Sequence, residues 1–243
     1  MSEPLSKQEI REQVWRALEI HGGARFPGAK GRIPDFTGAE RAALHLRDLP
    51  EWKRARVVKV DSDAPQLSVR RMALREGKVV YMAVPRLRAS ACFIELDPAR
   101  LGANSGRAAG IKGAAALGHA VTSAAVRPID LIVCGSVAVN GRGARVGKGG
   151  GDSDLEYGLL REHGLVTART PVVTTVHPLQ LVPHEIEMRP HDIVLDWIAT
   201  PEGLLHCGGG LTRPRGLYWE YLDDSKTAAV PALAEVQSAP HRS

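Results

Sequence analysis

The stretch IDLIVCGSVAVNGRGARVGKGGGDSDLEYG, residues 129–158, joins three features that together predict the fold. Its first part, 129–139, is the most apolar run in the chain and predicts a buried strand. Six glycines then fall within the eleven residues 141–151, and a helix is expected over 154–164. A strand, a glycine loop and a helix N-terminus in this order leave several backbone N–H groups free to bind an anion.

Basic side chains stand among these glycines and make phosphate the expected anion. Arg142, Arg145 and Lys148 lie inside the loop, and glycine lets the backbone approach a ligand closely. Asp152 and Asp154 would cap the following helix, and one of them could hold Mg²⁺ beside a polyphosphate. The loop does not fit the Walker or the dinucleotide-binding pattern. Phosphate binding therefore competes with a simpler interpretation, a flexible hairpin-like loop.

Outward from this stretch, apolar runs alternate with helical patterns. Strands are expected at 55–61, 78–85, 170–176 and 192–199, and a helix at 65–77. This alternation predicts an α/β fold: an open, mostly parallel sheet with helices on both faces. We expect a single domain over residues 1–226 and a disordered tail over 227–243, while the segment 100–128 shows no clear period.

The first helix has a clear beginning, because Ser6 and Glu9 form a capping box. Its apolar stripe consists of Ile10, Val14, Ala17 and Leu18. Lys7 falls over that stripe and Arg11 on its flank. Either both cations extend past the edge of the core into water, or both lean into a cleft that holds an anion. A second capping box, Thr37 with Glu40, predicts a short helix that ends near Leu49.

Length and composition describe an ordinary folded chain. It has 243 residues, of which 44% are hydrophobic and 24% charged, and a formal net charge of +5. These values exclude a disordered chain, a collagen-like repeat and a coiled coil. No stretch approaches the ~20 apolar residues that span a bilayer, and the polar start lacks a secretory signal. We therefore expect a cytoplasmic protein that binds neither membrane nor nucleic acid, and the sequence indicates no protein partner.

Cysteines and histidines carry no metal motif. The three cysteines are far apart and indicate reduced thiols rather than disulfides or a zinc site: Cys92, Cys134 and Cys207. Three histidines recur every seven residues, but prolines interrupt any helix that would align them: His177, His184 and His191. We expect His191 with Asp192 to fix a loop rather than to bind a metal.

The run RVGKGGGDSDLEYG, residues 145–158, resembles the glycine motif of 5-formyltetrahydrofolate cyclo-ligases, also called methenyltetrahydrofolate synthetases. Their motif is roughly Arg-Leu-Gly-x-Gly-x-Gly-Tyr-Tyr-Asp, and it is matched by Arg145, Gly147, Gly149, Gly151 and Asp154. Other segments are similar in the same order: KQEIR (7–11), VVYMAVPRLR (79–88) and PHEIEMRPHDIVLDWIAT (183–200). The resemblance covers about residues 6–201 and is closest to a divergent branch, the synthetase-domain-containing proteins.

This resemblance implies an ATP- and Mg²⁺-dependent cyclisation of a reduced folate. ATP phosphorylates the formyl oxygen of 5-formyltetrahydrofolate, a neighbouring amine attacks, and phosphate leaves as 5,10-methenyltetrahydrofolate forms. By matching positions, Arg145 and Lys148 would stabilise the transferring charge, and Asp154 would hold Mg²⁺. The nucleotide would be bound by Lys7, Arg11, Gly147, Gly149, Gly150, Gly151, Asp152 and Ser153.

Two substitutions in the motif leave other functions open. Asp152 and Ser153 stand where the family motif has two aromatic residues, which removes a stacking platform and adds negative charge. One alternative is a non-catalytic relative that binds folate or nucleotide. Another is the same chemistry on a different amide-bearing heterocycle.

Overall fold

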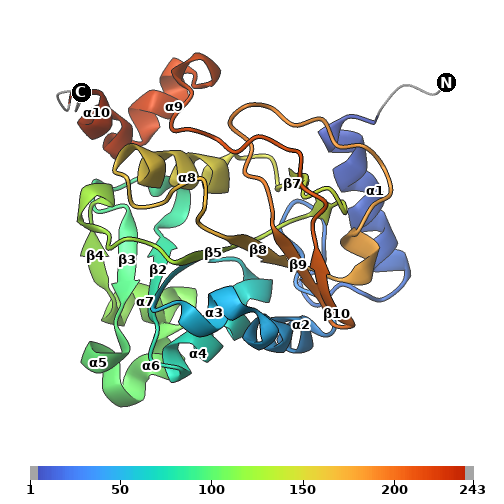
Figure 1. Cartoon of the computed structure of the whole chain (residues 1–243), viewed down its shortest axis with the longest axis horizontal. Coiled ribbons are helices and arrows are strands. Elements are labelled where there is room, and N and C mark those ends of the chain that lie inside the picture. The colour runs from blue at the N-terminus through green and yellow to red at the C-terminus, as the bar shows by residue number, and fades with distance from the viewer. Residues whose placement is uncertain (1–4, 239–243) are drawn as a thin grey trace.

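A single eight-stranded sheet forms the centre of the molecule (Figure 1). This computed structural model describes residues 5–238. The strand order is β10-β9-β8-β5-β1-β2-β3-β4. Its strands are β1 (Val57–Val60), β2 (Val79–Ala83), β3 (Phe93–Leu96), β4 (His119–Val121), β5 (Leu131–Cys134), β8 (Val172–Thr175), β9 (Trp197–Thr200) and β10 (Gly203–His206). The five strands from β9 to β2 run parallel, while β3, β4 and β10 are antiparallel at the edges.

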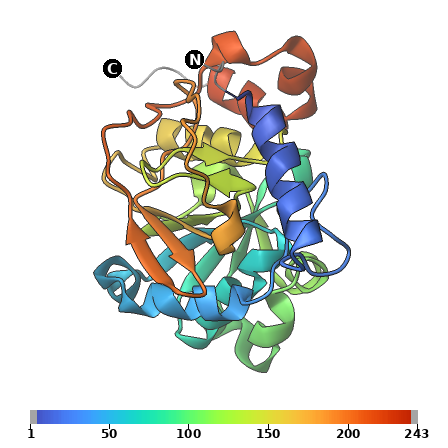
Figure 2. The same ribbon diagram turned by 90° about the vertical axis from the view of Figure 1, so that its right-hand side faces the viewer.

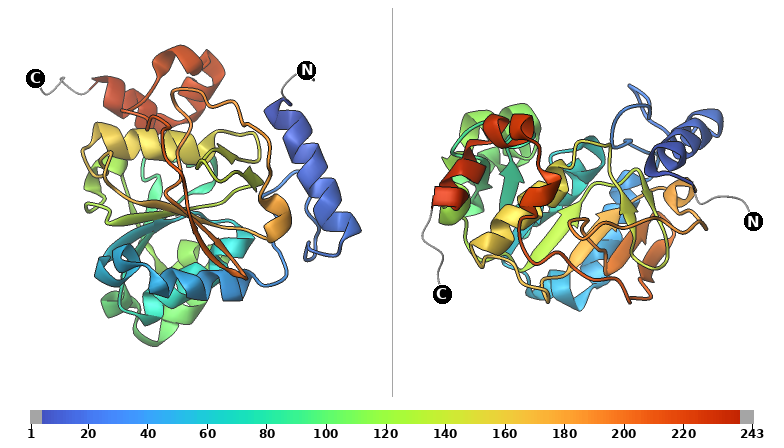
Figure 3. Two further views of the ribbon diagram at one scale, coloured as in Figure 1. Left: turned by 45° about the vertical axis from the view of Figure 1, so that its right-hand side comes forward. Right: turned by 90° about the horizontal axis from the view of Figure 1, so that it is seen from above.

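Helices cover both faces of this sheet, as the alternating pattern predicts (Figure 3). One face packs against α2 (Ala39–His45), α3 (Pro50–Arg54), α4 (Leu67–Arg75) and the short helices α5 (Pro98–Leu101), α6 (Ser105–Ala108) and α7 (Ile111–Leu117). The other face packs against α8 (Asp152–Glu162) and α10 (Pro231–Ser238), which α9 (Asp224–Ala229) precedes. The fold class expected from the sequence is therefore confirmed.

Helix α1 (Lys7–Ile20) lies beside the sheet rather than on either face (Figure 2). Its buried stripe packs against a two-stranded ribbon of β6 (Ala138–Val139) and β7 (Arg145–Val146). The Ser6–Glu9 capping box is formed at its start. The ribbon leads directly into the glycine loop, so α1 and the loop share one small core.

Several elements begin or end away from their expected positions. The predicted strand 129–139 is split into β5 and β6, because the N–H of Gly135 donates to the Asp61 carboxylate (2.9 Å) instead of continuing the sheet. The expected strand 192–199 begins only at Trp197, since Asp192 closes a turn with Arg189. The Thr37 capping box is wrong: α2 is preceded by Gly38, in a left-handed conformation (φ +90°), with no side-chain cap.

The end of the chain also differs from expectation. Disorder is predicted for 227–243, yet residues 227–229 belong to α9 and residues 231–238 to α10, and the last five residues lie outside the described ones. Val230, Ala232 and Leu233 are buried against α8 and the sheet. A short apolar pattern such as PALAEV is ambiguous alone but becomes helical where a neighbouring surface can cover it. Within residues 5–238, no helix is both long and apolar enough to cross a bilayer.

Candidate nucleotide and substrate site

A cavity of about 700 Å³ opens where the parallel strands β1 and β5 end. The chain continues from β1 to β2 on one side and from β5 to β8 on the other. Loops that leave a sheet in opposite directions create a crevice between them, the usual ligand site of open α/β sheets. The cavity is lined by Asp61 and Asp63 after β1, by Pro85 and Arg86 after β2, and by the glycine loop at residues 147–148 and 150–154.

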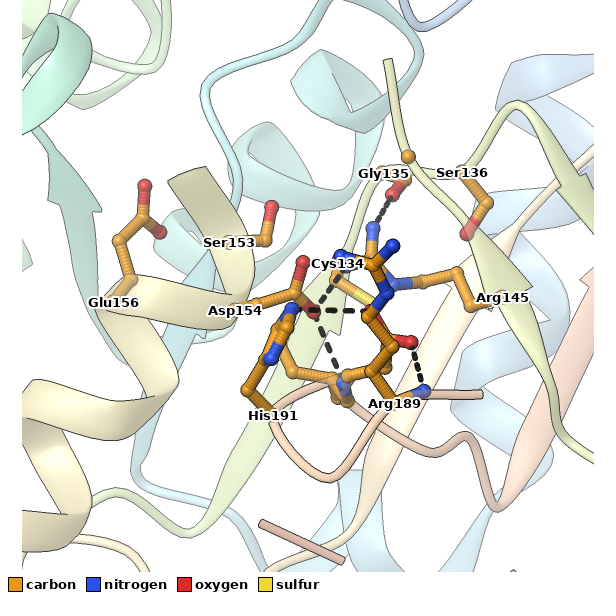
Figure 4. A network of polar contacts seen from close by, with 12 residues as sticks. Cys134, Gly135, Ser136, Arg145, Ser153, Asp154, Glu156, Arg189 and His191 are labelled. Carbon is orange, nitrogen blue, oxygen red and sulfur yellow. Dashed lines mark hydrogen bonds and ion pairs between the residues drawn. The ribbon is translucent and has the colours of Figure 1, made fainter. Parts of the chain in front are cut away.

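Arg145 occupies the floor of this site. Its side chain is 4% exposed and donates from Nη1 to the Gly135 carbonyl (2.9 Å) and from Nη2 to Asp154 Oδ1 (2.7 Å; Figure 4). Burial alone would lower the pKa of Arg145, but Asp154 and other nearby groups outweigh this effect and raise it. The guanidinium is therefore a permanent buried positive charge that lines the cavity.

The glycine loop adopts a conformation that requires glycine. Gly149 has φ +111° and Gly151 has φ +67°, values that other residues rarely adopt. Gly151 is the N-cap of α8, so the predicted start of that helix moves from Asp154 to Asp152. No side chain caps this N-terminus in the structure. Its backbone N–H groups and those of the loop lie beside the cavity, where they suit an anion.

Helix α1 meets the loop through Arg11. Its Nε donates to the Gly147 carbonyl (2.7 Å), and its guanidinium lies beside Gly149. Burial and the charge of Arg145 lower the pKa of Arg11. Among the described residues, no carboxylate forms an ion pair with Arg11, so its charge is available to an anion.

The second cation of α1 has a different environment. Lys7 forms an ion pair with Asp192, in the turn that precedes Ile193. The N–H of Ile193 in turn donates to Asp154 Oδ1 (3.0 Å). Lys7 therefore reaches the same side of the molecule as the loop, but through a carboxylate. The structure thus brings Arg11 into contact with the glycine loop, whereas Lys7 contacts Asp192 instead.

The remaining predicted residues are held by local polar contacts. Lys148 lies 3.4 Å from Asp63, whose pKa is raised by burial and by the charge of Asp61. Asp152 pairs with Lys226 (3.2 Å), which also donates to the Gly150 carbonyl (2.9 Å). Ser153 donates to Asp61 (2.7 Å). Lys148, Asp152 and Ser153 all line the same cavity.

A buried charge network, two of whose members line the cavity, was not expected from the sequence. Lys59 forms ion pairs with Asp61 and Glu156, and all three are almost completely buried. Burial raises the pKa of Glu156 to about 7, although Lys59 opposes this. Burial also disfavours ionisation of Asp61, but Lys59 holds its pKa below the ordinary value. The sequence does contain a signal for this network: in VVKVD, a lysine interrupts an apolar strand and an aspartate stands at its carboxyl end.

Two of the comparisons with known proteins concern sequence. A sequence model of the 5-formyltetrahydrofolate cyclo-ligase family matches residues 4–201. A methenyltetrahydrofolate synthase domain-containing protein of Bos taurus is 37% identical over 238 residues, 96% of this chain and 62% of that protein. The Mus musculus protein of the same name is 37% identical over 244 residues, 97% of this chain and 64% of that protein. The chain thus spans less than two thirds of these curated relatives.

The third comparison concerns structure. The NMR structure of the Aquifex aeolicus 5,10-methenyltetrahydrofolate synthetase is similar with a TM-score of 0.53 and 20% identity. The similarity covers 85% of this chain and 95% of that one, which shows a shared fold. The family match extends over most of the chain and includes α1, the glycine loop and the turn that carries Asp192. This chain therefore belongs to the 5-formyltetrahydrofolate cyclo-ligase family.

Proposed function

We propose that this chain is an ATP- and Mg²⁺-dependent ligase that converts 5-formyltetrahydrofolate to 5,10-methenyltetrahydrofolate in the cytoplasm. Membership of the family supports the reaction. One structural observation supports the nucleotide most strongly: Arg11 of α1 donates to Gly147 of the glycine loop (2.7 Å), although 136 residues separate them. The two segments that the resemblance assigns to ATP thus meet at the rim of one cavity.

In this proposal, the chain mainly aligns the substrates and neutralises the charge of the phosphates. Arg11 and the N–H groups of Gly149 to Gly151 hold the polyphosphate, since charged donors and free amides both favour phosphate oxygens. Arg145 contributes a fixed charge from below, and Lys148 exchanges its contact with Asp63 for the transferring phosphoryl group. Phosphoryl transfer depends on such positioning and charge stabilisation. The formyl oxygen is a poor leaving group, and the phosphoryl group from ATP would allow it to leave as phosphate.

The residues present are compatible with Mg²⁺. Asp154 Oδ1 already accepts from Arg145 and Ile193, which fixes the carboxylate and leaves Oδ2 for a ligand. Within residues 5–238, no three His, Cys, Asp or Glu side chains converge as a metal cage. Mg²⁺ beside a polyphosphate needs only one or two carboxylates, because water and phosphate complete its coordination. Asp154 would hold the ion, whose positive charge would counter that of the phosphates.

In this proposal, the same cavity also holds the folate. Its volume of about 700 Å³ lies within the range of small-molecule sites. Pro85 lines it, whereas Met82, in the same segment, is buried in the core. The backbone at Arg86 is left-handed (φ +58°), an uncommon conformation for a residue other than glycine. Such local strain is frequent next to ligands.

The direct test is turnover. Purified protein receives ATP, Mg²⁺ and 5-formyltetrahydrofolate, and the absorbance of methenyltetrahydrofolate is followed, with ATP omitted as the control. We expect product only with ATP present. Absence of product together with absence of calorimetric ATP binding would refute the proposal.

A second candidate is ligand binding without catalysis. It is favoured by the replaced motif residues: Asp152 is tied to Lys226 and Ser153 to Asp61, so both serve internal contacts. Binding of ATP and folate with no product would favour this candidate. ADP release stimulated by another amide-bearing heterocycle, but not by folate, would instead indicate the same chemistry on a different substrate.

A further inference from the structure

A second cavity, of about 200 Å³, adjoins the glycine loop. It shares Gly150, Gly151 and Asp154 with the larger cavity. The rest of its wall comes largely from residues 216–226, which lie beyond the family match that ends at residue 201. The two cavities thus share residues of the glycine loop, and the function proposed above assigns no ligand to the smaller one.

The segment 216–226 is anchored at both ends. The N–H of Leu217 donates to Glu162 on α8 (2.7 Å). Lys226 donates to the Gly150 carbonyl (2.9 Å) and pairs with Asp152 (3.2 Å). Between these anchors, the ring of Tyr221 packs against His191 with centroids 4.7 Å apart. The wall is therefore held in place by contacts with the loop and with its helix.

The chemistry of this wall suits a flat heterocyclic ring. Tyr218 and Tyr221 offer aromatic faces, and Leu155, Leu217 and Leu222 add apolar surface. His191 also lines the cavity, and its Nδ1 is buried without a hydrogen-bond partner among residues 5–238. The His191 ring therefore contributes to the wall of the cavity beside the Tyr221 ring.

We propose that the smaller cavity binds the purine base of the nucleotide whose phosphates lie at the glycine loop. This inference rests on the proposed function. The cavity is smaller than usual sites for complete small molecules, so it fits one ring system rather than a whole folate. Contact with Gly150 and Gly151 places that ring next to the phosphates, while the larger cavity stays available for the second substrate.

The test compares two probes that differ only in the nucleoside. ATP and inorganic tripolyphosphate are titrated by calorimetry into the wild-type protein and Tyr221→Ala. Aromatic stacking on a base is worth about 1–3 kcal/mol, so ATP affinity should fall at least about fivefold and typically more than tenfold. Tripolyphosphate affinity should not change. Tyr221→Phe keeps the ring and should bind ATP like the wild type.

Trp219→Ala is the matched control, because Trp219 lies in the same segment but does not line the cavity. It should leave both affinities unchanged. Unchanged ATP affinity in Tyr221→Ala, or equal losses for ATP and tripolyphosphate, would overturn the inference and leave the proposed function standing. 5-Formyltetrahydrofolate is titrated as a third probe, and a selective loss of its binding in Tyr221→Ala would overturn the inference too, since the ring bound would then be the pterin. A wild-type protein that binds no ATP would defeat the proposed function itself, and this inference with it.

Discussion

Arg145 and Asp154 form the contact on which the geometry of the glycine loop depends. The pair joins β7 to the first turn of α8, with the loop between them. Asp154 also accepts from Ile193, so the turn that carries Asp192 is tied to the same carboxylate. At this scale, a residue expected to bind a metal is also a structural anchor.

Loss of the Asp154 charge should destabilise the protein strongly. Asp154→Asn leaves the Arg145 guanidinium buried without its counter-charge, and such changes cost about 3–5 kcal/mol of unfolding free energy. The matched control is Glu185→Gln, which breaks the exposed pair with Arg142 and should cost less than about 1 kcal/mol. Urea denaturation measures both; equal losses would contradict the buried role.

Glu156 should make stability depend on pH. Burial raises the pKa of Glu156 to about 7. Lys59 opposes this shift, and the charge of Asp61 adds to it. An unfolded glutamate releases its proton near pH 4.5. The folded state therefore binds more protons between these values, and its unfolding free energy falls as pH rises from about 4.5 to 7.

The comparison with Glu156→Gln isolates this effect. The wild type should lose up to about 3 kcal/mol more than the variant between pH 4.5 and 7.5. Glu187→Gln, at an exposed position, should follow the wild type. Urea denaturation at several pH values gives the three curves, and parallel curves for wild type and Glu156→Gln would exclude Glu156 as the titrating group.

At the scale of elements, the glycine loop is a fixed conformation stretched between a ribbon and a helix. Gly149 has φ +111°, so Gly149→Ala should destabilise the chain by about 1–3 kcal/mol and weaken ATP binding. Gly106→Ala is the control, because Gly106 lies in α6 with open space around it and should be neutral or slightly stabilising. Equal ATP affinities in both variants would show that the loop conformation is irrelevant to binding.

At the scale of the whole molecule, the end of the chain is part of the core. Leu233 in α10 is fully buried, so Leu233→Ala should cost about 2–5 kcal/mol of unfolding free energy. Leu44→Ala, at a residue that is 52% exposed, should cost far less. Thermal unfolding measures the difference. An unchanged unfolding temperature in Leu233→Ala would contradict the burial of this helix and favour the disorder that the composition predicts.

Sequence patterns predicted the parts of the structure that depend on neighbours in the chain. The apolar runs 55–61 and 78–85 contain strands, and Ser6 caps its helix. The contacts of the site join distant residues, such as Lys7 with Asp192, and no local pattern specifies them. Helix α10 escaped prediction for the same reason, since its burial depends on the surface of α8.

The central claim is that α1 and the glycine loop together bind one polyphosphate. Calorimetric ATP affinity of Arg11→Ala tests it most directly, with Arg16→Ala, on the exposed side of the same helix, as the control. A charged hydrogen bond to phosphate is worth about 1.5–3 kcal/mol, so Arg11→Ala should bind ATP about 10- to 100-fold more weakly, and Arg16→Ala like the wild type. Unchanged ATP affinity in Arg11→Ala, with its fold intact, would contradict the claim.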